Sequence, residues 1–272
     1  MPSTRRNAIG LALSLLLLGS APAYAITLAN VIDLRTEGSS ETTGAGNGAL
    51  FFQNTSQPTG TGYYNPFLRL QDSPIEEAFN TDYRHNGQAP LDAKSDPNWT
   101  HSLTLGSLLA VTVNDVDYYA FSLDIDEPNA GTKRYISLDE VKLYVAGAPD
   151  LHTLGPATLK WSMDGAGDAV VYLDGGALSP GNGGDDMQML VPTSFFTGVD
   201  PSQYLYFYCK FGATAGMGAD AGANFDADAS FEEWRALRAQ NPPPPLIPEP
   251  ATIVLLGSGL AGMLAARRRR KK

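Results

Sequence analysis

The chain has 272 residues, of which 43% are hydrophobic and 18% charged, and its formal net charge is −10. Between residues 26 and 248 it has 11 Lys and Arg against 28 Asp and Glu, so this part carries a net charge of −17. Such a surface repels phosphate backbones, which excludes nucleic acid as an expected partner and favours cations, or polymers held through cations.

The first 25 residues have the three parts of a secretory signal peptide. Arg5-Arg6 precedes an apolar run from Ile9 to Gly19, and Ala23-Tyr24-Ala25 follows it. The small residues Ala23 and Ala25 predict cleavage after Ala25. We therefore expect the general secretion machinery to export the chain, with residues 26–240 as the exported domain.

Short runs of alternating apolar and polar residues recur along this domain, with turn residues about every ten positions. The clearest two flank Asn114-Asp115, because both residues tolerate the positive φ of a tight hairpin turn. A third run, Val141 to Val145, follows and predicts a β-meander with one buried face. Residues 72–100 lack a clear period and predict a long ordered loop.

These patterns predict an all-β domain, an antiparallel β-sandwich of jelly-roll-like type. One short C-terminal helix is expected to close it, because Ser230-Phe231-Glu232-Glu233 has the form of a capping box. Phe231, Trp234 and Leu237 would share one face of that helix. Four prolines then end it, and residues 241–247 form a stiff extended spacer.

Cys209 is the single cysteine of the chain, which excludes an intramolecular disulfide. It lies in an alternating run from Tyr204 to Phe211, in which Leu205, Phe207, Cys209 and Phe211 share a face. The pattern favours a buried thiol over a surface thiol that pairs with another chain.

Residues 248–272 contain three elements in a fixed order. Pro248-Glu249-Pro250 resists helix formation, because each proline lacks a backbone donor and restricts the residue before it. Apolar residues 251–266 follow, short for a membrane-spanning helix unless neighbouring residues and snorkelling basic side chains extend it. The tail ends in Arg267, Arg268, Arg269, Arg270, Lys271 and Lys272. Such a basic cluster predicts a cytoplasmic C-terminus, with the exported domain on the far side.

This order resembles the PEP-CTERM sorting signal of Gram-negative bacteria, which the membrane peptidase exosortase recognises. The resemblance implies an inner-membrane anchored precursor, cut near Pro248-Glu249-Pro250, and a product at the cell surface or in the extracellular matrix. An ordinary tail anchor is the alternative, in which the Pro-Glu-Pro element has no role. Segments such as Phe67 to Gln71 and Tyr118 to Glu127 also resemble other PEP-CTERM proteins, and that resemblance implies no particular activity.

The sequence shows no assembled catalytic motif. His85, His101 and His152 lack zinc-type spacing, and the serines lack a Gly-x-Ser-x-Gly elbow. Because carboxylates are abundant, a polysaccharide hydrolase stays open as a minor alternative. We expect no catalytic residues, and a structural or adhesive role linked to exopolysaccharide.

Calcium is the expected cation, if one binds. Asn224, Asp226 and Asp228 place oxygen ligands at alternate positions with Glu232 as a fourth group, which imitates the start of an EF-hand loop. Ala229 and Arg235 break that pattern, so an acidic turn is the competing interpretation. The acidic clusters Asp124 to Glu127 and Asp185-Asp186 are typical of solvated surface.

Aromatic side chains outside the core pattern predict a second kind of contact, with carbohydrate. Tyr204, Tyr206 and Tyr208 share the non-core face of one run, and Tyr64 and Trp99 lie in loop-like stretches. Planar apolar rings with polar edges suit sugar stacking. The alternative is that the tyrosine row is itself buried, because aromatic pairs also stabilise sheets. A calcium-assisted carbohydrate-binding module is therefore the runner-up function.

Overall fold

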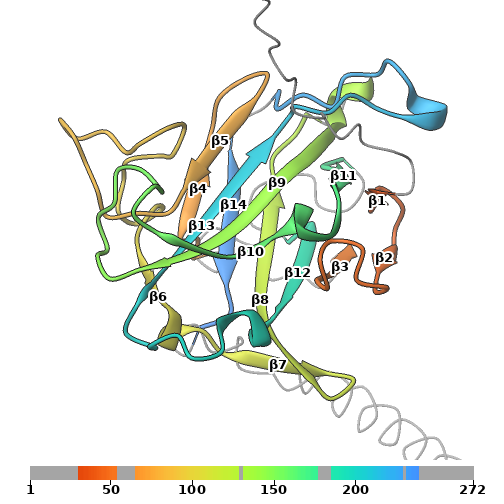
Figure 1. Ribbon diagram of the computed structural model, residues 1–272. Helices are drawn as coiled ribbons and strands as arrows, with labels where there is room; N and C mark the ends of the chain where they lie inside the picture. Colours follow the sequence, from red (N-terminus) through yellow and green to blue (C-terminus); the bar gives the residue numbers. More distant parts are fainter. Residues whose placement is uncertain (1–29, 54–64, 129–130, 177–184, 229–230, 239–272) are drawn as a thin grey trace, which may run out of the picture.

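The structure is a computed structural model and describes residues 30–53, 65–128, 131–176, 185–228 and 231–238 (Figure 1). The signal peptide, the proline-rich spacer and the sorting signal expected from the sequence lie outside these residues, as does Tyr64. Among the residues described, no helix is long and apolar enough to cross a membrane.

The longest described strand, β9 (Tyr135–Ala146), shows how the chain sorts its side chains. Ile136, Leu138, Val141, Leu143 and Val145 are buried in the core. The side chains between the last three, Lys142 and Tyr144, are only half-buried. Because successive residues of a strand face opposite sides, this alternation creates one apolar face that must pack against a second sheet.

Sheet A contains seven strands: β1 (Val31–Asp33), β5 (Glu76–Phe79), β6 (Leu103–Thr104), β9, β10 (Thr158–Ser162), β11 (Val170–Asp174) and β13 (Tyr204–Phe211). Its main order is β1-β11-β9-β13-β5, with β10 against β9 and β6 against β13. All of these pairings are antiparallel except that of β1 with β11, which is parallel. The predicted antiparallel architecture is therefore correct for every pairing in sheet A but one.

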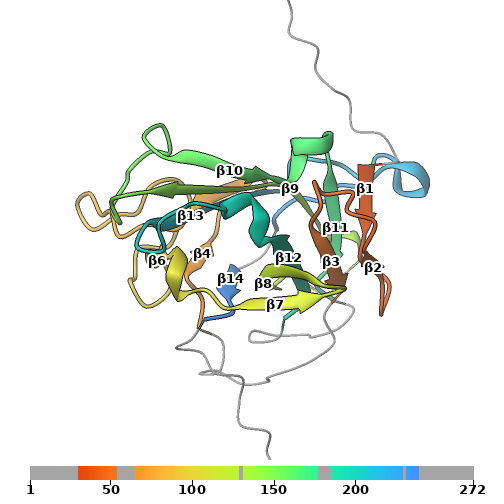
Figure 2. The same cartoon turned by 60° about the horizontal axis from the view of Figure 1, so that its bottom comes forward.

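Sheet B contains the other seven: β2 (Ser40–Glu41), β3 (Leu50–Gln53), β4 (Leu68–Leu70), β7 (Ala110–Val113), β8 (Val116–Ile125), β12 (Met187–Pro192) and β14 (Glu232–Ala236). The order is β2-β3-β12-β8-β14-β4, and β7 pairs with β8. In Figure 2, β9, β10 and β13 form the upper layer, and β7, β8 and β14 form the lower one.

Short 3₁₀ turns connect several strands: η2 (Leu105–Ser107), η3 (Gly131–Arg134), η4 (Met163–Ala166), η5 (Thr193–Phe196) and η6 (Gly218–Asp220). The described residues contain no α-helix.

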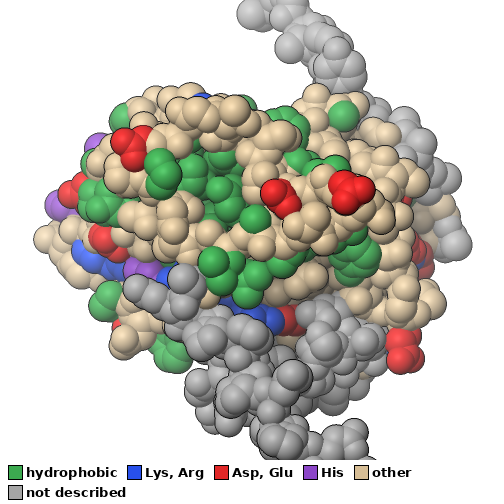
Figure 3. Space-filling view, turned by 90° about the horizontal axis from the view of Figure 1, so that it is seen from below, with side chains coloured by type: hydrophobic (Ala, Val, Ile, Leu, Met, Phe, Trp, Pro, Cys, Tyr) green, Lys and Arg blue, Asp and Glu red, His purple; other side chains and the backbone are tan. Residues whose placement is uncertain are grey.

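Large aromatic side chains join the two layers. Phe207 of sheet A lies 5.1 Å, between ring centroids, from Phe121 and 4.6 Å from Trp234, both of sheet B. Phe67 adds an edge-to-face contact with Phe207 at 5.5 Å. All four are fully buried, and aromatic pairs of this geometry add to the free energy gained by burying their area. Seen from below, apolar side chains also gather in the middle of one end of the sandwich (Figure 3).

The predicted hairpin turn is confirmed. Asn114 and Asp115 have φ values of 50° and 62° and connect β7 to β8 in antiparallel register. The predicted meander is wrong, because β9 does not pair with β8. It crosses to sheet A and pairs with β11, β10 and β13.

The predicted C-terminal helix is also wrong, because residues 232–236 form strand β14, between β8 and β4. Trp234 and Ala236 face the core while Arg235 faces outward, an alternation that a helix does not give. Two neighbouring strands supply backbone partners, and this tertiary pairing overrides the capping-box pattern. The predicted loop over residues 72–100 likewise contains strand β5 at the edge of sheet A.

Candidate functional site

The outer face of sheet A carries the predicted tyrosine row. Leu205, Phe207, Cys209 and Phe211 of β13 lie in the core, so Tyr204, Tyr206 and Tyr208 point to the other side. Cys209 is fully buried, as predicted, and burial raises the pKa of its thiol well above the ordinary value. A thiol in this state is not a nucleophile at neutral pH.

The three tyrosines differ in exposure. Tyr206 is 0% exposed. Its hydroxyl donates to the carbonyl of Ala148 at 2.6 Å and accepts from the Leu151 amide at 3.1 Å. The loop that follows β9 therefore covers this ring and closes it to a ligand, whereas Tyr204 and Tyr208 stay half-exposed. The alternative of a buried tyrosine holds for the middle residue only.

Tyr208 lies between charged groups. Its hydroxyl donates to the Glu77 carboxylate, and the Lys142 ammonium lies 5.7 Å from its ring centroid. Burial and the hydrogen bond to Glu77 both raise the pKa of the phenol, so it stays protonated at physiological pH. The ring is thus fixed in orientation while its face stays partly open.

Strand pairing extends the apolar surface to two further residues. Tyr144 of β9 lies opposite Tyr206 of β13, and Leu159 of β10 lies opposite Tyr144. Leu159 is 49% exposed and Tyr144 is half-buried. We call Tyr144, Leu159, Tyr204 and Tyr208 the sheet A platform. Alternation with the core residues Leu143 and Val145 indicates in the sequence that Tyr144 faces outward. The sequence does not indicate which strands lie beside it.

Trp99 lies away from this platform and has its own partner. The Arg69 guanidinium is 3.7 Å from the Trp99 ring centroid and 4.7 Å from that of Phe231. Arg69 also forms an ion pair with Glu233. One face of the indole is therefore occupied by a cation, so Trp99 and the tyrosines do not form one binding surface.

The four residues of the predicted calcium site do not converge. Phe225 and Ala227 point into the protein, so Asn224, Asp226 and Asp228 point outward, whereas Glu232 points into the interior and is 2% exposed. Within the described ranges, no group of three or more His, Cys, Asp or Glu side chains is arranged to hold a metal ion.

The acidic pair Asp185-Asp186 is not solvated surface, contrary to the prediction. Asp185 is 0% exposed and receives a hydrogen bond from Nε of Arg235 at 2.8 Å, within an ion pair. Asp186 accepts the backbone N–H of Ile125 at 2.8 Å, and burial raises its pKa well above the ordinary value. Both carboxyl groups are structural parts of sheet B.

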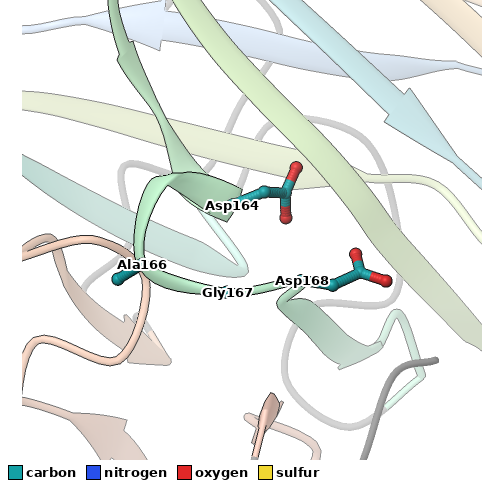
Figure 4. A pocket seen from close by; sticks show the side chains of 4 residues that line it. All are labelled: Asp164, Ala166, Gly167 and Asp168. Carbon is teal, nitrogen blue, oxygen red and sulfur yellow. The ribbon is translucent and has the colours of Figure 1, made fainter. Parts of the chain in front are cut away.

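A hollow of about 560 Å³ lies beside η4, lined by Asp164, Ala166, Gly167 and Asp168 (Figure 4). Asp164 accepts the Ala169 amide at 3.0 Å, and burial is the main reason that its pKa is raised. In Figure 4 the two carboxylates point to the same side of the loop. The amide of Ala169 in the same loop holds Asp164, and the predicted site residues lie elsewhere.

The three histidines lie in separate environments. His101 Nε2 is 3.2 Å from a guanidinium nitrogen of Arg238, and burial lowers the pKa of the imidazole. His152 packs on Tyr83 with ring centroids 5.4 Å apart. His85 is exposed and lies 3.1 Å from the Asn86 amide.

Comparison with known proteins identifies the tail. Residues 246–270 match the family model of the PEP-CTERM protein-sorting motif. The chain therefore carries a PEP-CTERM sorting motif, and this motif implies an exported protein with a membrane-anchored precursor that exosortase processes. No curated protein and no solved structure matches the chain significantly.

Proposed function

We propose that this protein is a non-catalytic component of the cell surface or the extracellular matrix, with a structural or adhesive role linked to exopolysaccharide. The observation that carries the proposal is the sorting motif at residues 246–270, which lies C-terminal to Arg238, the last described residue of the sandwich. We infer that the motif directs the folded β-domain to the cell envelope. A domain with a net charge of −17 suits a hydrated matrix, where like-charged surfaces stay soluble.

Deleting exosortase tests the processing step. In the deletion strain the protein should be larger and remain in the membrane fraction. In the wild-type strain, a Glu249→Ala variant should show the same defect, while Glu37→Ala, a change of an exposed carboxylate in the sandwich, should not. Unchanged size and location in the deletion strain contradict the proposal.

The second candidate is a carbohydrate-binding module, and the sheet A platform favours it. Half-exposed aromatic rings of Tyr144, Tyr204 and Tyr208 lie on the same outer face of sheet A as the exposed Leu159, which is opposite Tyr144. Flat apolar rings beside charged groups such as Lys142 and Glu77 are the chemistry that sugar rings stack on. Calcium would assist such binding from the outward-facing side-chain oxygens of Asn224, Asp226 and Asp228, although these do not form a cage.

A glycan array on the purified full-length chain separates the two candidates. Specific binding that is lost in Tyr204→Ala and kept in Tyr204→Phe establishes the second candidate, because the Phe variant keeps the stacking ring and loses only the hydroxyl. The array is run with calcium and with chelator to test the assisting ion. Absence of specific binding under both conditions supports the structural role.

A further inference from the structure

Three glutamates from different elements point into the interior at one end of the sandwich. Glu76 begins β5 of sheet A, Glu232 begins β14 of sheet B, and Glu127 follows β8. They are 0%, 2% and 6% exposed. Buried carboxylates are normally paired with a cation. The groups around the three glutamates therefore indicate whether their carboxyl groups are ionised or protonated.

Glu76 and Glu232 approach each other from opposite layers. Glu76 lies opposite Phe211, and Glu232 lies between Leu70 and Ile125. Their carboxyl groups share a hydrogen bond. A hydrogen bond between two carboxyl groups requires a proton on one of them, because two carboxylates have acceptors only.

Backbone donors favour Glu76 and Glu127 as acceptors. Oε2 of Glu76 accepts the Asp72 amide at 3.0 Å, and Oε1 of Glu127 accepts the Asp228 amide at 3.1 Å. One further oxygen of each of the three glutamates is buried without a hydrogen-bond partner. An unpartnered oxygen in a neutral carboxyl group costs much less free energy than one in a carboxylate.

Loops close this end tightly. A Cβ on Gly175 would lie 2.9 Å from the Cβ of Glu127. On Gly212, which has φ +78°, it would lie 2.2 Å from the Pro74 carbonyl oxygen. The Ala227 amide donates to the same carbonyl at 2.9 Å. Backbone therefore packs directly against Glu127 and against Pro74, two residues before Glu76.

The charged groups around the glutamates are mostly acidic. The charge of Asp92 raises the pKa of Glu76, and that of Lys94 lowers it. The charge of Asp126 raises the pKa of both Glu127 and Glu232. Asp228 acts on Glu127 and forms an ion pair with Lys133 at 3.5 Å. The thiol of Cys209 lies in the field of Glu76 and Glu232. Among these charged side chains, Lys94 is the one that favours the charged form, and it lowers the pKa of Glu76.

We propose that Glu232 is protonated at neutral pH and donates a hydrogen bond to Glu76. This acid pair, together with Glu127, makes the sandwich a pH-sensitive device whose folding stability falls as the pH rises. The device acts at the end of the domain where the two sheets are joined by residues 71–75. It requires no ligand, because the proton itself is the bound group.

The direction follows from proton linkage. Burial raises the pKa of Glu232 well above the ordinary value, raises that of Glu76, and raises that of Glu127 to about 8. The folded protein therefore binds more protons than the unfolded chain above the ordinary glutamate pKa. The stability from these groups is complete below that pKa and is lost as the pH rises through the folded-state values.

The test is the melting temperature of the full-length chain in mild detergent, measured between pH 4.5 and 9 by fluorescence of the buried Trp161 and Trp234. Glu232→Gln mimics the protonated acid and donates to Glu76 permanently. It should melt within about 1 °C of wild type at pH 4.5 and about 5 °C higher at pH 9. The control Glu37→Gln, at an exposed position, should follow the wild-type profile. Parallel profiles for Glu232→Gln and wild type overturn the proposal.

A second readout keeps the test independent of folding defects. The infrared carbonyl band of a buried, protonated carboxyl group should be present in wild type at pH 7 and weakened in Glu232→Gln, and Glu76→Gln repeats the measurement from the other partner. Calcium and chelator are compared at matched ionic strength. A calcium-dependent rise in the melting temperature that disappears in Glu232→Gln, or the absence of the band, overturns the proposal in favour of a bound cation or an ionised pair.

Discussion

Glu232 and Glu233 are neighbours on β14, yet the two faces of the strand bury them in different ways. Glu232 faces another acid, Glu76, in the interior. Glu233 points outward, where it forms an ion pair with Arg69. Two residues further along, Arg235 pairs with the buried Asp185 on the same outward side. A carboxyl group in the interior is thus kept neutral by a proton, and one on the outer side of sheet B is neutralised by an arginine.

The largest effect is expected where a counter-charge is removed from the outer side. Arg235→Met removes the guanidinium that pairs with the carboxylate of Asp185, which is 0% exposed. Removing one partner of a buried ion pair destabilises by about 3–5 kcal/mol, and the partial exposure of Arg235 places the loss near the lower figure. Urea unfolding measures it. The double variant with Asp185→Leu should recover most of the loss, and a loss below about 1 kcal/mol contradicts the assignment.

A gain of stability is expected on the inner side. Because the pKa of Glu127 is raised to about 8, the folded protein must take up a charge there as the pH rises, which it resists. Glu127→Gln should therefore match wild type near pH 4.5 and exceed it at pH 9, by on the order of 2 kcal/mol after relaxation around the charge. Denaturant midpoints at the two pH values give the difference. An equal offset at both would show that proton linkage is not its cause.

The smallest change in stability is expected for Arg69→Lys, which separates the charge of the arginine from the shape of its guanidinium group. Arg69→Lys keeps the positive charge beside Glu233 but loses the planar group stacked on Trp99 and Phe231. We expect a loss of about 1 kcal/mol, because the planar fork and its stacking are what lysine lacks. Thermal unfolding, followed by tryptophan fluorescence, measures the loss. A loss as large as that of Arg69→Met would assign the whole interaction to the guanidinium geometry and none to the charge.

The interior acids were the part of the molecule that sequence patterns concealed. Glu76 lies in a stretch without visible period, and Glu232 lies inside the capping-box pattern Ser230 to Glu233 of a helix that does not form. Each is an ionisable residue at an inward position, so it breaks the apolar alternation by which strands are recognised. A polar residue at a core position interrupts the alternating pattern, so its strand is hard to recognise from the sequence.

The same inward turn of Glu232 separates it from the other residues of the predicted calcium site. Alternating oxygens at Asn224, Asp226 and Asp228 correctly indicate one face of an extended segment, and that face is outward. Glu232 continues the spacing in the sequence but belongs to a strand that turns its side chain inward. Ligand spacing along a chain predicts a site only where the backbone between the ligands has the curvature of a binding loop.

Short-range patterns established the features that depend on neighbouring residues alone. The positive φ of Asn114 and Asp115, the two faces of β13 with Cys209 buried, and the sorting motif at the C-terminal end all follow from interactions within a few residues. The choice of partner for β9, the strand in place of a helix at residues 232–236 and the pairing of Glu76 with Glu232 were set by tertiary packing. These features depend on which distant segments bury the most apolar surface together. Such contacts stabilise the fold only after the entropy cost of closing long loops has been met.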